Sequence, residues 1–209
     1  MPKKLNKYYR YVIIIVDKKG AKMGTRNLTA VIIDNKPCIA QYGQWDGYPE
    51  CTGAHIFDFL RDIILSNRLE EFKEKTKQCV FVTDKDIDNK YKSLGIDISS
   101  GFIAFEDAHK FKDVYPQLDR DMGCDVLDFV LENGGCELIN QYEFINDALF
   151  CEWAYVIDMD NECLEVYGGA GSAYKTSERF PEMTCYKVPF KDIAKTATSV
   201  FVKTANKRY

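Results

Sequence analysis

The first strongly patterned part of the chain is a pair of apolar segments separated by a turn. Residues Arg26–Asp34 alternate between apolar and polar side chains and then become continuously apolar, which is typical of a half-buried β-strand. Asn35–Pro37 has the composition of a turn, and Cys38–Gln44 can return as the partner strand. The pattern therefore predicts an antiparallel hairpin with Val31 and Ile33 on the face that packs into the core.

Three later segments carry apolar residues at helical spacing. Gly53–Ser66 repeats them three and four residues apart, and Thr52 stands where a helix N-cap belongs. Leu69–Lys77 is expected to form a second, highly charged helix. Asp121–Glu132 gathers apolar side chains on one face, and Asn133–Gly135 is a C-cap signal. The apolar positions are Ile56, Leu60, Ile63 and Ile64 in the first segment and Leu127, Val130 and Leu131 in the third.

Shorter apolar runs predict the remaining strands. Cys79–Thr83 is expected to be a short buried strand, and Phe102–Phe105 another short strand. Phe150–Ile157 and Cys163–Tyr167 flank a turn and form a second hairpin, in which Trp153 is mostly buried in a central strand. Helices interspersed among hairpins, without regular strand–helix–strand alternation, predict an α+β fold of antiparallel hairpins with packed helices.

The amino-terminal part differs from the rest of the chain. Tyr8–Val16 is apolar and β-branched and lies between two basic, polar stretches. Two interpretations of residues 1–22 stand open: an extra N-terminal strand, or a translated leader that precedes a natural start at Met23. The second rests on Lys19–Met23, which can be encoded with a ribosome-binding sequence directly before a start codon. Residues 23–209 show no internal repeat and no linker, and they are expected to form a single α+β domain.

Composition and charge narrow the classes of function. Hydrophobic residues make up 46% and charged residues 29% of the 209 residues, which is an ordinary globular balance. The net charge of −4 argues against a general nucleic-acid binder, since such a protein presents a strongly basic face. No apolar run approaches the roughly 20 residues that a bilayer-spanning helix needs, so no membrane association is expected.

The eight cysteines do not show a metal-binding or disulfide pattern. No two of them form a CxxC pair, and no histidine stands at ligand spacing from a cysteine pair. Most lie in apolar runs, where a free thiol behaves as a small hydrophobic side chain. The expected location is a reducing cytoplasm, and no cofactor or metal site is expected.

The segment Gln41–Pro49 is the candidate functional site. It places two amides, three aromatic rings, a carboxylate and two glycines in nine residues, at the end of a predicted strand. Asp46 is the candidate catalytic residue, and the expected ligand-binding residues are Arg26, Gln41, Gln44, Trp45 and Tyr48, all lining one concave pocket. The hairpin is expected to bring Arg26 close to Asp46, where it pairs with the carboxylate or accepts a ligand anion. The alternative is a structural loop in which Asp46 caps the following helix.

Two other strings match known site motifs poorly. Gly168–Thr176 resembles a phosphate-binding loop, but Tyr174 stands where that motif requires glycine, so a loop after the second hairpin is expected. Asp84–Asp88 resembles the start of a calcium loop but is followed by neither the required glycine nor the glutamate. It is expected to be a solvated helix start.

Three stretches carry a family resemblance. Met23–Thr29, Ala40–Pro49 and Cys151–Asp158 resemble a family of uncharacterised phage and bacterial proteins with an MGTRNLT and QYGQWDGYP signature. The resemblance implies a phage or prophage setting, and therefore the cytosol of the host cell. It implies no settled activity.

A fainter resemblance joins the opening of this sequence to N-terminal-nucleophile amidohydrolases of the choloylglycine hydrolase type. That likeness implies an αββα sandwich fold. Gly24 occupies the position of the nucleophilic cysteine, and only Asp46 corresponds to the Arg-Asn-x-Asp segment of those enzymes. Without the thiol, attack by an amine-activated cysteine cannot occur.

Three functions remain open from the sequence. The first is a phage protein that binds a small, nucleotide-like ligand and so counters host defence signalling. The second is a hydrolase, either an N-terminal-nucleophile-like amidohydrolase or a phosphodiesterase, that uses Asp46. The third is a protein-interaction module that inhibits a host enzyme through surface contact.

Overall fold

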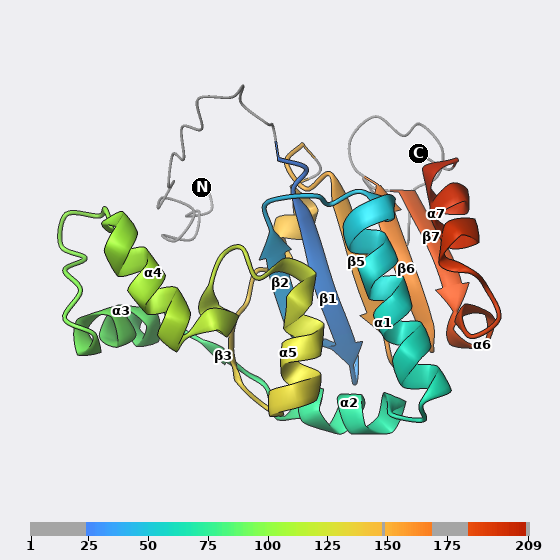
Figure 1. Cartoon of the computed structure of the whole chain (residues 1–209), viewed down its shortest axis with the longest axis horizontal. Helices are drawn as coiled ribbons and strands as arrows, with labels where there is room; N and C mark the ends of the chain where they lie inside the picture. Colours follow the sequence, from blue (N-terminus) through green and yellow to red (C-terminus); the bar gives the residue numbers. More distant parts are fainter. Residues whose placement is uncertain (1–23, 148, 169–183, 208–209) are drawn as a thin grey trace.

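The computed structural model describes residues 24–147, 149–168 and 184–207 and shows a mixed α+β fold (Figure 1). The strands are β1 (Asn27–Ile33), β2 (Lys36–Gly43), β3 (Val80–Val82), β4 (Glu137–Ile139), β5 (Trp153–Asp158), β6 (Cys163–Gly168) and β7 (Thr184–Pro189). The α-helices are α1 (Ala54–Leu65), α2 (Leu69–Lys77), α3 (Asp84–Ser93), α4 (Phe105–Val114), α5 (Val126–Asn133), α6 (Phe190–Ile193) and α7 (Thr198–Asn206). Short helical turns are η2 (Pro49–Gly53), η3 (Pro116–Leu118), η4 (Gly123–Asp125) and η5 (Tyr142–Asn146).

Both predicted hairpins are confirmed, and they meet in one sheet. The five-stranded sheet has the order β2-β1-β5-β6-β7. Strands β1 and β2 pair antiparallel, as do β5 and β6, whereas the two hairpins join through a parallel β1–β5 pair. β5 is therefore the central strand, as expected. Trp153, its first residue, is partly buried against the core.

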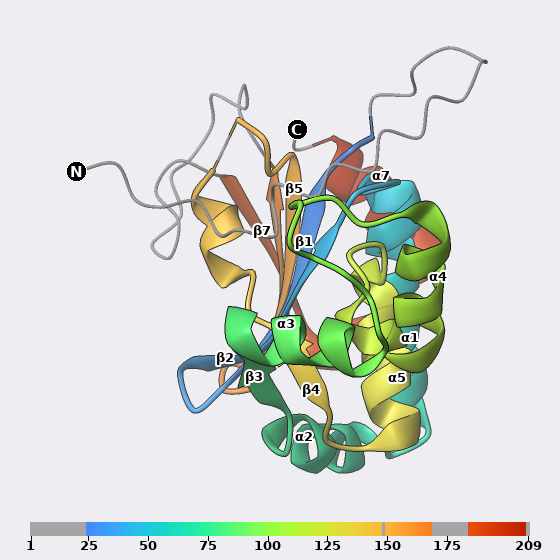
Figure 2. The same ribbon diagram turned by 90° about the vertical axis from the view of Figure 1, so that its left-hand side faces the viewer.

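The two faces of this sheet pack against different elements. Figure 2 shows the sheet nearly edge-on, with α1 and α5 on one side and the η5 segment on the other. Val31 and Ile33 belong to the core on the helical side, as predicted, together with Leu127 and Val130 of α5. Leu28 and the other even-numbered residues of β1 belong to the opposite core. The alternation of the strand thus separates two hydrophobic layers.

Strands β3 and β4 form a separate, two-stranded parallel sheet beside α3 and α4. The expected strand over Cys79–Thr83 is confirmed as β3, but its burial is not, since Val80 is 57% exposed at its edge. The predicted strand at Phe102–Phe105 is wrong. Phe102 is 76% exposed, and Phe105 begins α4 after Ala104 in an extended N-cap conformation. A four-residue apolar run has too little periodicity to separate a strand from a loop that enters a helix.

The predicted solvated helix start at Asp84 is confirmed as α3. The Thr83 hydroxyl accepts from the backbone N–H of Asp86, and the Asp86 carboxylate accepts from the backbone N–H of Thr83, which forms a capping box. The C-cap expected after α5 is also present, because Gly134 has a positive φ of 82°.

Two expectations fall on residues that the structure does not describe, and a third is not confirmed. Residues 1–22 lie outside the described residues, as does most of the Gly168–Thr176 string. The described residues contain one large sheet and not the second sheet of an αββα sandwich, so that part of the fold prediction is not confirmed. Among the described helices, none has the length and apolar character needed to cross a membrane.

Candidate functional site

The segment Gln41–Pro49 leaves the end of β2 and crosses the start of β1 before it enters η2. Three consecutive carbonyl groups in its loop each accept a hydrogen bond from a side chain of another element. The Asn27 amide donates to the carbonyl of Trp45 at 3.3 Å. The Thr52 hydroxyl donates to that of Asp46 at 2.9 Å, and the Tyr155 hydroxyl to that of Gly47 at 2.8 Å.

Backbone hydrogen bonds fix the same loop. The N–H of Gly47 donates to the carbonyl of Thr25 at 3.0 Å, and the N–H of Thr52 donates to that of Asp46 at 3.1 Å. Gly47 lies so close to β1 that a Cβ there would be 2.7 Å from the Thr25 carbonyl oxygen, which explains the glycine. The loop backbone is therefore held by contacts with β1, η2 and β5.

Asp46 has a backbone conformation that an L-residue rarely adopts. Its φ is 52°, in the left-handed region, where most non-glycine residues are destabilised by about 1–2 kcal/mol. The Asp46 side chain does not cap the next helix. Thr52, the predicted N-cap, does not cap it either, because the π-helical turn η2 comes first and Gly53 is the N-cap of α1. The Thr52 hydroxyl instead holds the carbonyl of Asp46.

In contrast to its backbone, the loop exposes its large side chains. Trp45 and Tyr48 are each 47% exposed, and Asp46 between them is also exposed. Trp45 packs one edge of its ring on Gly24, where a Cβ would be 2.7 Å from the indole. The position that corresponds to the nucleophilic cysteine of N-terminal-nucleophile enzymes therefore has no room for a side chain in this arrangement.

The two glutamines of the segment have different environments. Gln41 is buried, and its amide donates to the carbonyl of Asp119 at 3.2 Å. Gln44 is closer to the surface, and its side-chain oxygen accepts from the Tyr42 hydroxyl at 2.6 Å and from the Arg120 guanidinium. The exposed Arg120, 5.3 Å from the centre of the Tyr42 ring, was not predicted as a site residue.

Arg26 does not form the expected ion pair with Asp46. Its guanidinium lies 4.5 Å over the Phe150 ring, and its backbone N–H donates to the Glu152 carboxylate at 3.3 Å. The reason is strand alternation, because Arg26 has the same parity as Leu28, which faces the core opposite the helices. Arg26 lies at the expected end of the strand, but its side chain contacts Phe150 and not Asp46.

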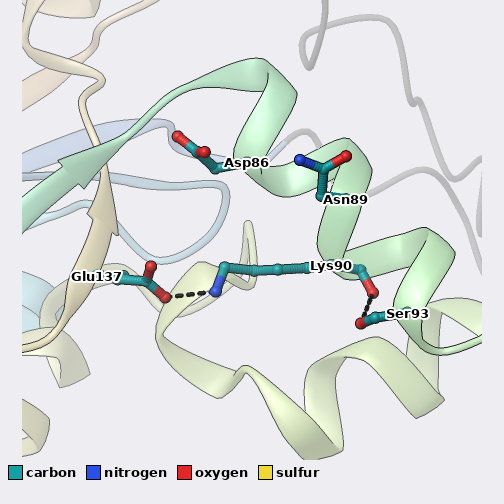
Figure 3. Close-up of a pocket in the computed structure, with 5 residues that line it drawn as sticks. All are labelled: Asp86, Asn89, Lys90, Ser93 and Glu137. Carbon is teal, nitrogen blue, oxygen red and sulfur yellow. Dashed lines mark hydrogen bonds and ion pairs between the residues drawn. The ribbon is translucent and has the colours of Figure 1, made fainter.

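A hollow of about 320 Å³ opens on a different part of the surface, between α3 and β4 (Figure 3). It is lined by Asp86, Asn89, Lys90, Ser93 and Glu137. Lys90 and Glu137 form an ion pair there, and the Lys90 ammonium also lies 4.7 Å from the centre of the Tyr115 ring. None of the predicted site residues lines this hollow, and its charges already satisfy one another. The concave pocket expected at Gln41–Pro49 remains a prediction.

A second group of polar side chains, which we call the His55 cluster, lies where α1 meets η4 and α5. It consists of His55, Cys124, Asp125 and Asp128. One ligand atom from each of the first three lies within 4.8 Å of the others. The Nε2 atom of His55 is 2.9 Å from a carboxylate oxygen of Asp128. Burial, and then the charge of Asp125, raise the pKa of the Cys124 thiol to about 12.

Sequence analysis did not find the His55 cluster. Metal-ligand motifs place a histidine close in sequence to a cysteine pair, whereas the fold here brings together single residues from two distant segments. The cluster also adjoins the candidate segment. Thr52, which holds the Asp46 carbonyl, lies next to Cys124 as well.

Comparison with known proteins adds no assignment. No family model, curated protein or solved structure matches this chain.

Proposed function

We propose that this chain is a binding protein whose Gln41–Pro49 segment recognises a small ligand with a flat, nucleotide-like ring. One observation carries the proposal. Buried side chains of three other elements fix the carbonyls of Trp45, Asp46 and Gly47, while the side chains of Trp45, Asp46 and Tyr48 are exposed. The arrangement is typical of a loop that presents recognition groups in fixed directions.

The exposed side chains of Trp45, Asp46 and Tyr48 contribute little to the free energy of folding. Two large aromatic rings remain half in water, and Asp46 holds a left-handed backbone. A ligand that stacks on an aromatic ring gains about 1–3 kcal/mol for each base, so a flat ring is the natural partner of Trp45 or Tyr48. Because the loop is already ordered, binding would not cost its conformational entropy again.

The polar groups around the rings indicate which ligand edges would fit. The carboxylate of Asp46 accepts hydrogen bonds only, so it favours a ring edge that carries N–H groups. Arg120 lies beside Gln44 and carries a guanidinium suited to phosphate oxygens. A nucleotide combines these features, with an aromatic base at one end and an anion at the other.

The biological setting is part of the same proposal. The resemblance of three stretches to phage proteins favours a role in the host cytosol, and sequestration of a nucleotide signal would counter host defence. Such a role needs tight binding and no catalysis. A hydrolase that uses Asp46 gains no supporting contact from the described geometry.

The two tryptophans of the chain make the proposal testable by fluorescence. In a Trp153→Phe variant, Trp45 is the sole tryptophan, and a stacked nucleotide is expected to quench its emission. In Trp45→Phe, the emission of Trp153 is expected not to respond, and calorimetry is expected to show at least a tenfold loss of affinity. The panel should contain linear and cyclic purine and pyrimidine nucleotides.

The role of Asp46 is tested by Asp46→Asn. We expect a loss of nucleotide affinity of at least tenfold with an unchanged thermal midpoint, because the carboxylate is exposed. If no nucleotide in the panel binds, or if Trp45→Phe binds as tightly as the wild type, the proposal fails.

A protein partner is the second candidate, and the equal exposure of Trp45 and Tyr48 favours it. Tryptophan and tyrosine dominate the energetic centres of protein interfaces. This function predicts that Trp45→Ala abolishes binding to a host protein while nucleotides have no effect on Trp45 fluorescence.

A further inference from the structure

We propose that the His55 cluster is a binding site for a divalent transition metal of the zinc class, with His55, Cys124 and Asp125 as the protein ligands. The proposal does not rest on the proposed function, because the residues differ from those of the Gln41–Pro49 segment. It rests on the meeting of an imidazole, a thiol and a carboxylate from α1 and η4 at one place.

The distances suit a metal ion. Zinc binds nitrogen, sulfur and oxygen ligands at about 2.0–2.3 Å, which places tetrahedral ligand atoms about 3.3–3.7 Å apart. The three ligand atoms of the cluster already lie within 4.8 Å of one another without an ion. Shifts of about 1 Å in the ligand atoms would bring them to the spacing of a zinc site.

The surroundings also fit such a site. Asp128 is hydrogen-bonded to Nε2 of His55 at 2.9 Å, which leaves Nδ1 for the metal and gives Asp128 the place of the outer carboxylate of a histidine ligand. The hydroxyl of Thr52 lies beside the sulfur of Cys124. His55 and Asp125 are exposed while Cys124 is partly buried, so an ion can enter from solvent and still meet a sheltered sulfur.

The types of ligand atom in the cluster determine which metal ions it would prefer. Magnesium and calcium prefer oxygen ligands, whereas a thiolate and an imidazole favour zinc or cobalt. When the metal–sulfur bond forms, the Cys124 thiol loses its proton to solvent, and the ion carries the charge of the resulting thiolate. The fourth position is left for water.

Cobalt is the probe of choice, because bound Co²⁺ reports sulfur ligation directly. Titration of the metal-free, reduced protein with Co²⁺ is expected to give a near-ultraviolet sulfur-to-cobalt charge-transfer band that saturates at one ion per chain. Zn²⁺ is expected to displace it. Cys124→Ser should abolish the band, and His55→Ala and Asp125→Asn should each weaken binding at least tenfold. Asp128→Asn should weaken it about 10- to 100-fold, as the loss of an outer partner does.

Cys136→Ser is the matched control, because Cys136 and Cys79 are free thiols that lie close together elsewhere in the described chain. It should leave the charge-transfer band intact. A wild-type protein without the band, or a band that survives Cys124→Ser, would overturn the proposal. If Cys124→Ser does not fold, thiol alkylation of the wild type tests the proposal instead. Zn²⁺ must then protect Cys124 but not the exposed Cys51.

Discussion

The hydroxyl group of Tyr155 offers a sharp test of how the loop is held. Tyr155 is completely buried in the central strand β5, and its hydroxyl donates to the carbonyl of Gly47 at 2.8 Å. The substitution Tyr155→Phe removes one oxygen atom and leaves the ring in place. The hydrophobic packing of the core is thereby preserved, and the carbonyl of Gly47 loses a donor.

The expected size of the effect follows from the burial of this bond. A typical hydrogen bond contributes about 1 kcal/mol net, and a buried acceptor left without its donor costs about 1–3 kcal/mol. Because Gly47 is buried, we expect Tyr155→Phe to lower the free energy of unfolding by about 1–3 kcal/mol. For a chain of this length, each kcal/mol corresponds to about 2–4 °C in the thermal midpoint.

Urea denaturation followed by far-ultraviolet circular dichroism measures this loss, with the slope of the transition unchanged. Tyr48→Phe is the matched control, because Tyr48 lies in the same segment but is 47% exposed, and it should change stability by less than about 0.5 kcal/mol. In the Trp153→Phe background, Tyr155→Phe should also alter Trp45 emission, since the loop is less firmly held. Equal stabilities of Tyr155→Phe and wild type would refute this account of the loop.

Two further predictions concern the helices and the central strand. Hydrogen bonds from Arg68 and then Lys75 lower the pKa of Glu71 from 4.5 to about 2. The ionised Glu71 therefore stabilises the fold above about pH 4.5, and this stabilisation is lost as the pH falls through about 2. Glu71→Gln should therefore lower the thermal midpoint at pH 7, and the difference from wild type should vanish near pH 2 or in high salt. Trp153→Ala should lower the free energy of unfolding by about 3 kcal/mol, the low end for a large aromatic residue, because Trp153 is partly buried. In urea denaturation, an unchanged midpoint would contradict that burial, and the exposed Trp45→Ala is the control.

The parts of the fold that sequence predicted well are those with a long, regular period. The β1 strand alternates at its start and is continuously apolar around Val31 and Ile33, and both of these side chains are buried on the helical face. The helix expected at Gly53–Ser66 appears as α1 with four apolar positions in register, three of them buried. In such segments the burial of one face decides the structure, and sequence records that face directly.

Predictions for short segments were wrong because contacts with the rest of the fold determine the structure of such segments. Phe102–Phe105 is apolar enough for a strand, yet no neighbouring strand pairs with it among the described residues, and its first ring stays in water. Thr52 has the right chemistry for an N-cap, but a π-helical turn moves the helix start by one residue. Its hydroxyl was then free to bind the loop. Neither the loop at Phe102–Phe105 nor the π-helical turn before α1 can be predicted from the neighbouring sequence alone.

The residues of the candidate site were likewise predicted only in part. Sequence identified the loop around Trp45 and Asp46 from its composition, and the structure shows these side chains exposed on a fixed backbone. Sequence did not identify Arg120, which reaches Gln44 from another segment, nor the His55 cluster. Contacts between distant segments depend on the packing of α1 against α5, which no spacing rule within the chain can supply.

The side chains that hold the loop give the strongest argument that its conformation matters. Asn27 and Tyr155 occupy buried positions at the end of the sheet where apolar side chains would lose no hydrogen bonds to water on folding. Their polar atoms are buried at a cost, which the bonds to the carbonyls of Trp45 and Gly47 offset in part, since the side-chain oxygen of Asn27 has no hydrogen-bond partner among the described residues. A loop that needed only to connect β2 to α1 would not require such support. Because the core holds the loop in this single geometry, the directions of Trp45, Asp46 and Tyr48 are set before any ligand or partner arrives.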